Sequence, residues 1–200
     1  MSLPPLLLAL TAHEFCHGYA ALKMGDPTAK LAGRLTFNPI KHLDIFGFLA
    51  FLLFRFGWAK PVPVDPRNFY DYRKGIFVTS LAGPLSNLLL AIPFGLAIRI
   101  FPDMSAVKFL FPLAIMLQLG LVYNLIFCAF NLIPIPPLDG SKILFSLLPA
   151  NFAAMELWLE RYGAVILLGL IFFDRITGIP VLWGWIGPFV TFFGRLFSGT

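Results

Sequence analysis

The chain has 200 residues, of which 58% are hydrophobic and 12% charged, and its mean hydropathy is +0.83. Soluble domains are about 45–50% apolar and about 25% charged, so this composition excludes an ordinary soluble domain and predicts an all-α polytopic membrane protein. The net charge of +5 is typical of cytoplasmic loops and lipid head groups, and we expect no nucleic-acid partner because aromatic and basic residues do not interleave.

The long apolar segments predict the membrane-spanning helices. Residues 3–22 are long enough to cross a hydrocarbon core of about 30 Å, and the Lys- and Arg-rich loop after them indicates the cytoplasmic side. Residues 45–57 are apolar but short, contain Arg55 and have positive loops on both flanks, so we expect them to enter the membrane and return. Residues 76–98 and 109–132 are expected to cross outward and then inward again.

A proline-rich segment follows the third of these spans. Pro134, Pro136 and Pro137 remove helix donors and restrict their neighbours, so the helix is predicted to break here. Irregular backbone at membrane depth is tolerated only where it is buried in protein or lines a cavity. We therefore expect the backbone at this break either to be buried in protein or to line a cavity.

The remaining residues predict a C-terminal extension. Residues 162–173 and 179–197 are apolar and predict one or two further helices. The sequence does not show whether these segments cross the membrane once or twice. We expect one integral membrane domain over residues 1–200. Its core is expected at about residues 3–150 and its C-terminal helices at about residues 151–200.

The segment TAHEFCHGYA, residues 11–20, places three ionisable groups in an apolar helix. His13 and His17 lie one turn apart on the same face, so their imidazoles can bind one ion. Glu14 is rotated by about 100° from His13, which places it beside that ion as a general base. Each charge in a span costs about 2.5–3.5 kcal/mol on insertion scales, and a zinc ion supplies the compensation. The alternative, a chance match, is rare in a chain of this length.

A catalytic zinc usually has three protein ligands and a water, so one further ligand is expected. If residues 3–22 run inward, the third span also runs inward and places Asp139 near the depth of the two histidines. The alternative is a turn aspartate before Gly140. The helix break and the histidine pair together favour the ligand.

Four motifs follow one another along the chain: HEFCH, GWAKPVPVDPRNF, AGPLSN and NLIPIPPLDG. Together they resemble the site-2 protease family of intramembrane zinc metalloproteases, in its compact bacterial and archaeal form without a PDZ or CBS domain. The resemblance implies a three-helix catalytic core with a broken third helix. It also implies zinc ligation by His13, His17 and Asp139, with Glu14 as general base in peptide hydrolysis.

The resemblance has further implications around this core. The segment near residues 30–56 is expected to fold as a membrane-associated β-hairpin or re-entrant element whose edge pairs with an extended substrate. Asn131 and Asn87 match family positions near the active site and are expected to bind substrate. The Asn131 amide could contact the scissile carbonyl or satisfy carbonyls at the helix end, and neither is favoured. Gly83 is expected only to allow close helix packing, and His42 to be a surface or interfacial histidine.

We therefore expect a multi-pass zinc metalloprotease in the cell membrane of a bacterium or archaeon, with its active site toward the cytoplasm. Its expected cofactor is Zn²⁺, and its expected partners are a transmembrane protein substrate and the lipid bilayer, with a homo-oligomer left open. Two alternatives are a catalytically silent relative that binds membrane helices and a zinc-binding transporter. A transporter needs a polar path, and the spans offer few polar residues beyond Asn87, Asn124 and Gln118.

Overall fold

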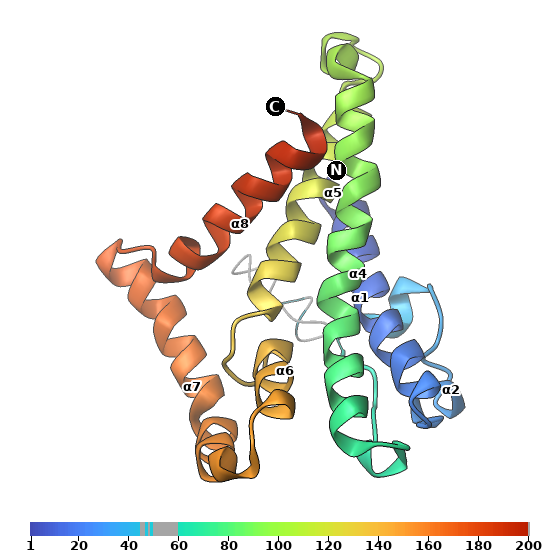
Figure 1. Cartoon of the computed structure of the whole chain (residues 1–200). Helices are drawn as coiled ribbons and strands as arrows, with labels where there is room; N and C mark the ends of the chain where they lie inside the picture. The colour runs from blue at the N-terminus through green and yellow to red at the C-terminus, as the bar shows by residue number, and fades with distance from the viewer. Residues whose placement is uncertain (45–46, 48, 50–59, 200) are drawn as a thin grey trace.

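The computed structural model describes residues 1–44, 47, 49 and 60–199. These residues form helices joined by short turns, as the composition predicts (Figure 1). In chain order the elements are α1 (Leu3–Lys23), α2 (Thr28–Leu31), η1 (Pro39–His42), η2 (Pro66–Asn68), α4 (Tyr72–Ile100), η3 (Pro102–Ala106), α5 (Phe111–Asn131), α6 (Asp139–Leu147), η4 (Ala150–Phe152), α7 (Ala153–Thr177) and α8 (Val181–Ser198).

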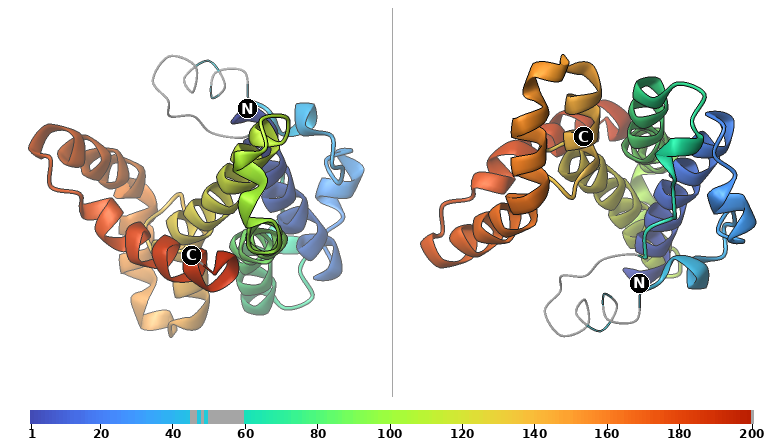
Figure 2. Two further views of the ribbon diagram at one scale, coloured as in Figure 1. Left: turned by 90° about the horizontal axis from the view of Figure 1, so that it is seen from above. Right: turned by 90° about the horizontal axis from the view of Figure 1, so that it is seen from below.

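Three long helices, α1, α4 and α5, pack against one another and form the centre of the molecule (Figures 1 and 2). Small side chains let them approach closely, since Ala9 of α1 and Ala91 of α4 are completely buried. Leu121 and Leu125 of α5 pack on Ala91 and complete an apolar cluster. The cluster joins α4 to α5, and α4 also packs along α1, so α4 contacts both of the other helices.

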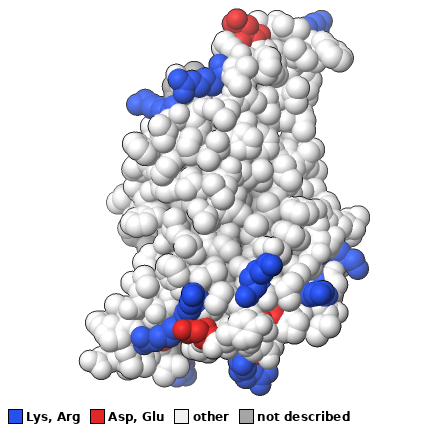
Figure 3. Space-filling model, turned by 45° about the vertical axis from the view of Figure 1, so that its right-hand side comes forward, with Lys and Arg blue, Asp and Glu red and all other residues white. Residues whose placement is uncertain are grey.

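The length and composition of the helices fit a membrane. Among the described residues, α4 and α5 are each long and apolar enough to cross a bilayer, and α7 with α8 counts as a third span if the bent pair is taken as one. On the face shown in Figure 3, charged side chains gather toward the two ends of the molecule, and a broad band without them lies between. Helix α1 has the length of a span, but His13, Glu14 and His17 lower its hydropathy, so its crossing stays a prediction.

The predicted helix break lies between α5 and α6. Helix α5 ends at Asn131 and α6 begins at Asp139, so the proline-rich segment separates two helices. A Cβ on Gly140 would overlap the carbonyl oxygens of Leu132 and Ile133. Glycine is therefore required at this position for the first turn of α6 to pack on the end of α5.

Two C-terminal helices are present. Helices α7 and α8 meet at an angle of 92° across a short break, where Gly178 adopts a left-handed φ of 71°. Phe193 and Phe197 of α8 pack on the α4–α5 cluster. Helix α7 stands away from the three central helices (Figure 2), although Gly163 packs closely against Pro136.

The predicted hairpin near residues 30–56 falls partly outside the described residues, which here are 30–44, 47 and 49. Its described part contains the end of α2, the η1 turn and no strand, so the β-hairpin is not supported there. The prediction for His42 is wrong, because this side chain is only 2% exposed. Its Nε2 donates to the carbonyl oxygen of Thr36 at 2.8 Å, which folds the loop between α2 and η1 back on itself.

The loop after α1 is organised by Asp26, which is completely buried. Its carboxylate accepts hydrogen bonds from Thr28, from the Asn68 amide and from the backbone N–H of Asp65. Desolvation by itself would raise the pKa of Asp26, but these hydrogen bonds outweigh it and hold the pKa below the ordinary aspartate value. Asp26 thus joins the end of α1 to the segment that leads into η2.

Candidate metal centre

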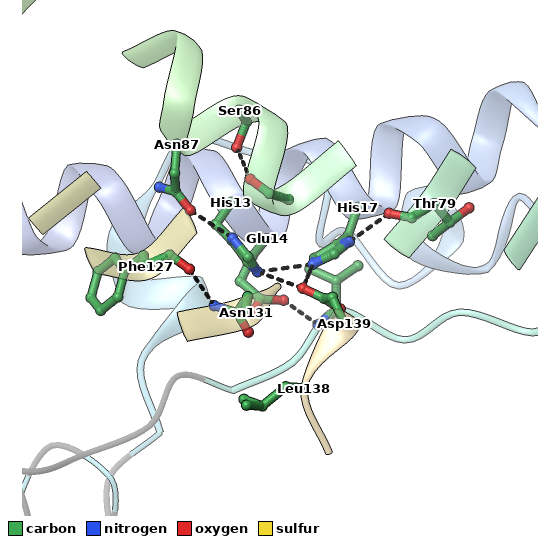
Figure 4. Close-up of polar contacts among 12 residues, drawn as sticks. His13, Glu14, His17, Thr79, Ser86, Asn87, Phe127, Asn131, Leu138 and Asp139 are labelled. Carbon is green, nitrogen blue, oxygen red and sulfur yellow. Dashed lines mark hydrogen bonds and ion pairs between the residues drawn. The ribbon is translucent and has the colours of Figure 1, made fainter. Parts of the chain in front are cut away.

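Helices α1 and α6 bring three of the predicted site residues together. The Nε2 atoms of His13 and His17 are 2.9 Å apart, and Oδ2 of Asp139 lies 3.2 Å from the first and 3.1 Å from the second (Figure 4). Among the described residues, these side chains form a group that could hold a metal ion. Asp139 occupies the first position of α6, where the helix dipole favours a negative charge.

The hydrogen bonds of the two imidazoles fix which nitrogens face the centre. His17 Nδ1 lies 2.7 Å from the carbonyl oxygen of Thr79, which can only accept, so Nδ1 carries the proton. His13 Nδ1 lies 2.7 Å from Oδ1 of Asn87. The Asn87 amide nitrogen is committed to the Ala9 carbonyl oxygen at 3.0 Å, so Oδ1 also accepts. In the neutral form of each ring, Nε2 therefore has a free lone pair, which is directed toward the Asp139 carboxylate.

Two lone pairs and a carboxylate oxygen at these separations repel one another unless a cation lies between them. Ligand atoms bound at about 2.0–2.2 Å around a tetrahedral zinc are about 3.3 Å apart, close to the observed separations. Two imidazoles and one carboxylate are also a donor set that catalytic zinc sites use. The three residues therefore fit zinc, and they leave a fourth position for water.

Asn87 supports the metal centre from inside the protein. Its side chain is completely buried and does not line the cavity, so this placement gives no support to the expected contact with substrate. Instead it accepts from His13, and its amide nitrogen donates to Ala9 and, at 2.9 Å, to Oδ1 of Asn124. Asn124 in turn donates to the carbonyl oxygen of Gly120 at 2.8 Å. These hydrogen bonds connect α1, α4 and α5, and they fix the orientation of the His13 ring.

We expect Asn87→Ala to weaken zinc binding by about 10- to 100-fold, because partners of metal-binding histidines contribute about this much affinity. The measurement is a competition titration with a zinc-chelating dye on the purified protein in detergent. The exposed Asn151 provides the control variant Asn151→Ala. Equal zinc affinities in the two variants would contradict a supporting role for Asn87.

Gly83 has a larger role than close helix packing. A Cβ at this position on α4 would overlap Nε2 of His17 and Cε1 of His13. Glycine therefore makes the space between α1 and α4 that both imidazoles occupy. The motif AGPLSN contains this glycine, but the sequence does not show that it faces the histidines, because the contact joins residues far apart in the chain.

A cavity of about 410 Å³ opens beside the three ligand atoms. Its walls come from α1, α4, α5, α6 and α7 and from the segment before η2, and they include His13, Glu14, His17, Asn131 and Asp139. Glu14 is half-buried, and its Oε2 accepts a hydrogen bond of 2.8 Å from the backbone N–H of Val62. A carboxylate thus lies at the cavity wall one residue from His13 of the group that could hold a metal ion.

Asn131 lies at the end of α5 and lines the same cavity. Its amide nitrogen donates to the carbonyl oxygen of Phe127 at 3.0 Å, one turn earlier in α5. This bond agrees with a helix-terminal role, and the position in the wall agrees with a contact to substrate. Both interpretations of Asn131 therefore stay open.

Comparisons with known proteins give one family match. Residues 98–170 match the model of peptidase family M50. The matched range contains Asn131 and Asp139, whereas His13, Glu14 and His17 precede it. No solved structure gives a significant match.

Several curated proteins named "Putative zinc metalloprotease" resemble the chain over longer ranges. YwhC of Bacillus subtilis is 40% identical over 182 residues, which cover 89% of this chain and 82% of YwhC. Rip2 of Mycolicibacterium smegmatis is 31% identical over 138 residues, or 67% of this chain and 52% of Rip2. MJ0611 of Methanocaldococcus jannaschii is 35% identical over 100 residues, or 50% of this chain and 49% of MJ0611.

Proposed function

Because the chain belongs to peptidase family M50, the site-2 protease family of zinc metalloproteases, we propose that it cleaves a peptide bond within or near a transmembrane segment of a membrane protein. In this proposal His13, His17 and Asp139 bind the zinc and Glu14 is the general base. The whole chain acts as one membrane-embedded protease domain, with its core in residues 3–150.

One observation carries the proposal: Nε2 of His13, Nε2 of His17 and Oδ2 of Asp139 converge within 3.2 Å of one another beside a cavity that also contains Glu14. The Nδ1 proton of each imidazole has its own acceptor away from this centre, which makes both Nε2 atoms available as ligands. A metal ion satisfies all three donors, and the open side toward the cavity leaves room for water and substrate.

The residues around the centre have distinct tasks in hydrolysis. A bound zinc ion supplies Lewis acidity and lowers the pKa of a bound water toward about 7. The Glu14 carboxylate takes the proton of the attacking water and passes it to the leaving amine nitrogen. Asn87 and the Thr79 carbonyl keep Nδ1 of His13 and of His17 protonated, so each Nε2 stays available as a ligand.

The substrate and the location follow from the membrane setting. A peptide bond in a transmembrane helix is protected by its own hydrogen bonds, so the substrate must unwind locally before the bond reaches the cavity. Lys and Arg are abundant in the loop after α1 and around η2, which favours a cytoplasmic location for this end. We propose the cell membrane of a bacterium or archaeon as its location, with the active site toward the cytoplasm.

Removal of the metal tests this function. We expect 1,10-phenanthroline to abolish cleavage of single-span membrane protein substrates by the purified enzyme, and added Zn²⁺ to restore it, since both Lewis acid and activated water are lost with the ion. The isomer 1,7-phenanthroline does not chelate and serves as the control. Product measured by mass spectrometry at full rate in the presence of the chelator would contradict the proposal.

The cleavage assay, together with co-purification and zinc-transport measurements, separates the two alternatives. A catalytically silent relative would retain a single-span protein during co-purification and yield no product. A transporter would move zinc into proteoliposomes without cutting any substrate. Neither alternative requires a carboxylate beside the metal ligands, whereas hydrolysis does, and Glu14 occupies that position.

A further inference from the structure

The motif GWAKPVPVDPRNF contains a segment that lines the cavity beside the candidate metal centre. We call residues 60–65, with the sequence KPVPVD, the strap. The strap contains no helix, and Pro61, Val62 and Val64 contribute to the cavity wall.

The strap offers one backbone donor at its centre. Pro61 and Pro63 have no N–H, so Val62 carries the single N–H between them. This N–H donates to Oε2 of Glu14 at 2.8 Å, and Val62 is only 8% exposed. Because the prolines on both sides cannot donate, the backbone at this point of the strap can hydrogen-bond to Glu14 only through Val62.

A buried arginine anchors the upstream end of the strap. Nη2 of Arg34 donates to the carbonyl oxygen of Lys60 at 2.8 Å and, more weakly, to that of Pro61 at 3.4 Å. The Lys60 N–H donates to the carbonyl oxygen of His42 at 2.9 Å. Arg34 is 8% exposed, and among the described residues its Nη2 finds these two acceptors whereas its Nε finds none. Its location therefore ties the strap to the loop that contains η1.

The downstream end and the underside of the strap are fixed as well. The Asp65 N–H donates to Oδ2 of the buried Asp26 at 2.7 Å. Beneath the strap, a Cβ on Gly18 would lie 3.0 Å from Cγ1 of Val62, so a glycine one turn after Glu14 lets the strap approach α1 closely. The strap is thus held at both ends while its central N–H contacts Glu14.

We propose that the strap is a positioning element, in which Val62 and its anchor Arg34 hold the Glu14 carboxylate in the orientation required for proton transfer. This inference rests on the proposed function, in which Glu14 is the general base. A glutamate side chain has several accessible rotamers, and one hydrogen bond from a fixed backbone selects among them. Loss of the bond should slow the chemical step and leave the metal ligands in place.

The comparison of Val62→Pro with Val62→Ala tests the strap. Proline removes the N–H and keeps a side chain of similar size, whereas alanine keeps the N–H and removes most of the side chain. We expect kcat for Val62→Pro to lie about 10- to 100-fold below that of Val62→Ala, as for other small misplacements of catalytic groups, with similar KM and zinc content. Equal kcat values in the two variants would overturn the inference.

Arg34 provides a second, independent variant. We expect Arg34→Met to lower kcat without changing KM or zinc content, because the carbonyl oxygens of Lys60 and Pro61 lose their anchor. Arg175→Met is the matched control, since this exposed arginine lies in the last turn of α7, outside the strap and outside the cavity wall. An Arg34→Met enzyme with the kcat of Arg175→Met would argue against the strap.

The outcomes distinguish this inference from the proposed function. If the wild-type enzyme yields no product from any single-span substrate, the proposed function fails. If the wild-type enzyme cuts and the strap variants lose zinc or helical circular dichroism, the strap supports the metal site or the fold, and the positioning role is overturned. If they keep both and lose only kcat, the inference holds.

Discussion

Replacing Glu14 with glutamine is expected to lower the rate of peptide hydrolysis by about 10²- to 10⁴-fold, the usual contribution of a general acid–base group. The amide has the shape of the carboxylate and its oxygen can still accept from Val62, but it cannot take a proton from water. Zinc content should therefore match the wild type. The measurement combines the initial rate on a purified single-span substrate with the zinc stoichiometry of the same sample.

Asp103→Asn is a suitable control for this variant, because Asp103 is an exposed carboxylate in η3, and η3 lies at the far end of α4 (Figure 1). Its rate should equal that of the wild type. A Glu14→Gln enzyme that cleaves at the wild-type rate would remove the proposed mechanism. A Glu14→Gln protein without zinc would instead assign Glu14 a role in metal binding.

Replacing Asp139 with asparagine is expected to reduce zinc affinity by more than about 100-fold. Loss of a residue that only hydrogen-bonds to a metal-binding histidine reduces this affinity by about 10- to 100-fold, and loss of a ligand should cost more. The carboxylate supplies the anionic donor of the three, and the neutral amide binds zinc poorly. Activity should fall with the metal content. Asparagine is chosen because it keeps the size of the side chain at the first position of α6, so α6 itself should remain folded.

Metal content and activity separate the possible outcomes for Asp139. The zinc stoichiometry after dialysis against a competing chelator is compared with that of Asp103→Asn, which should retain the ion. High zinc concentrations should partly restore the activity of Asp139→Asn, since His13 and His17 remain. Full zinc affinity together with full activity would exclude Asp139 as a ligand. Its role would then be that of a turn aspartate before Gly140.

The local parts of the site were predictable because helix geometry is a short-range property. A spacing of four residues places His13 and His17 on one face of any helix, and their Nε2 atoms are indeed 2.9 Å apart. The proline-rich break before Asp139 was equally readable, because proline cannot donate within a helix. The hairpin near residues 30–56 was drawn from the resemblance rather than from periodicity, and the described residues contain no strand there.

Other features of the site depend on residues far apart in the chain. Asn87 was expected to bind substrate, and the structure instead places it behind His13, 74 residues away in the sequence. His42 was expected at the surface and is buried beside the strap. A single sequence carries the residue types but no information on these partners.

The sequence by itself determined a helical membrane protein, the pair of histidines with their glutamate on one helix, and the point at which the third long helix breaks. These follow from composition, from the 3.6-residue period and from the chemistry of proline, all of which act over a few residues. Only the tertiary structure decided that Gly83 makes room for the imidazoles, that Asn87 orients His13 and that the strap contacts Glu14. Those contacts arise from the packing of α4, α5 and the strap around α1, and packing is set by the shapes of all the side chains together rather than by any one segment.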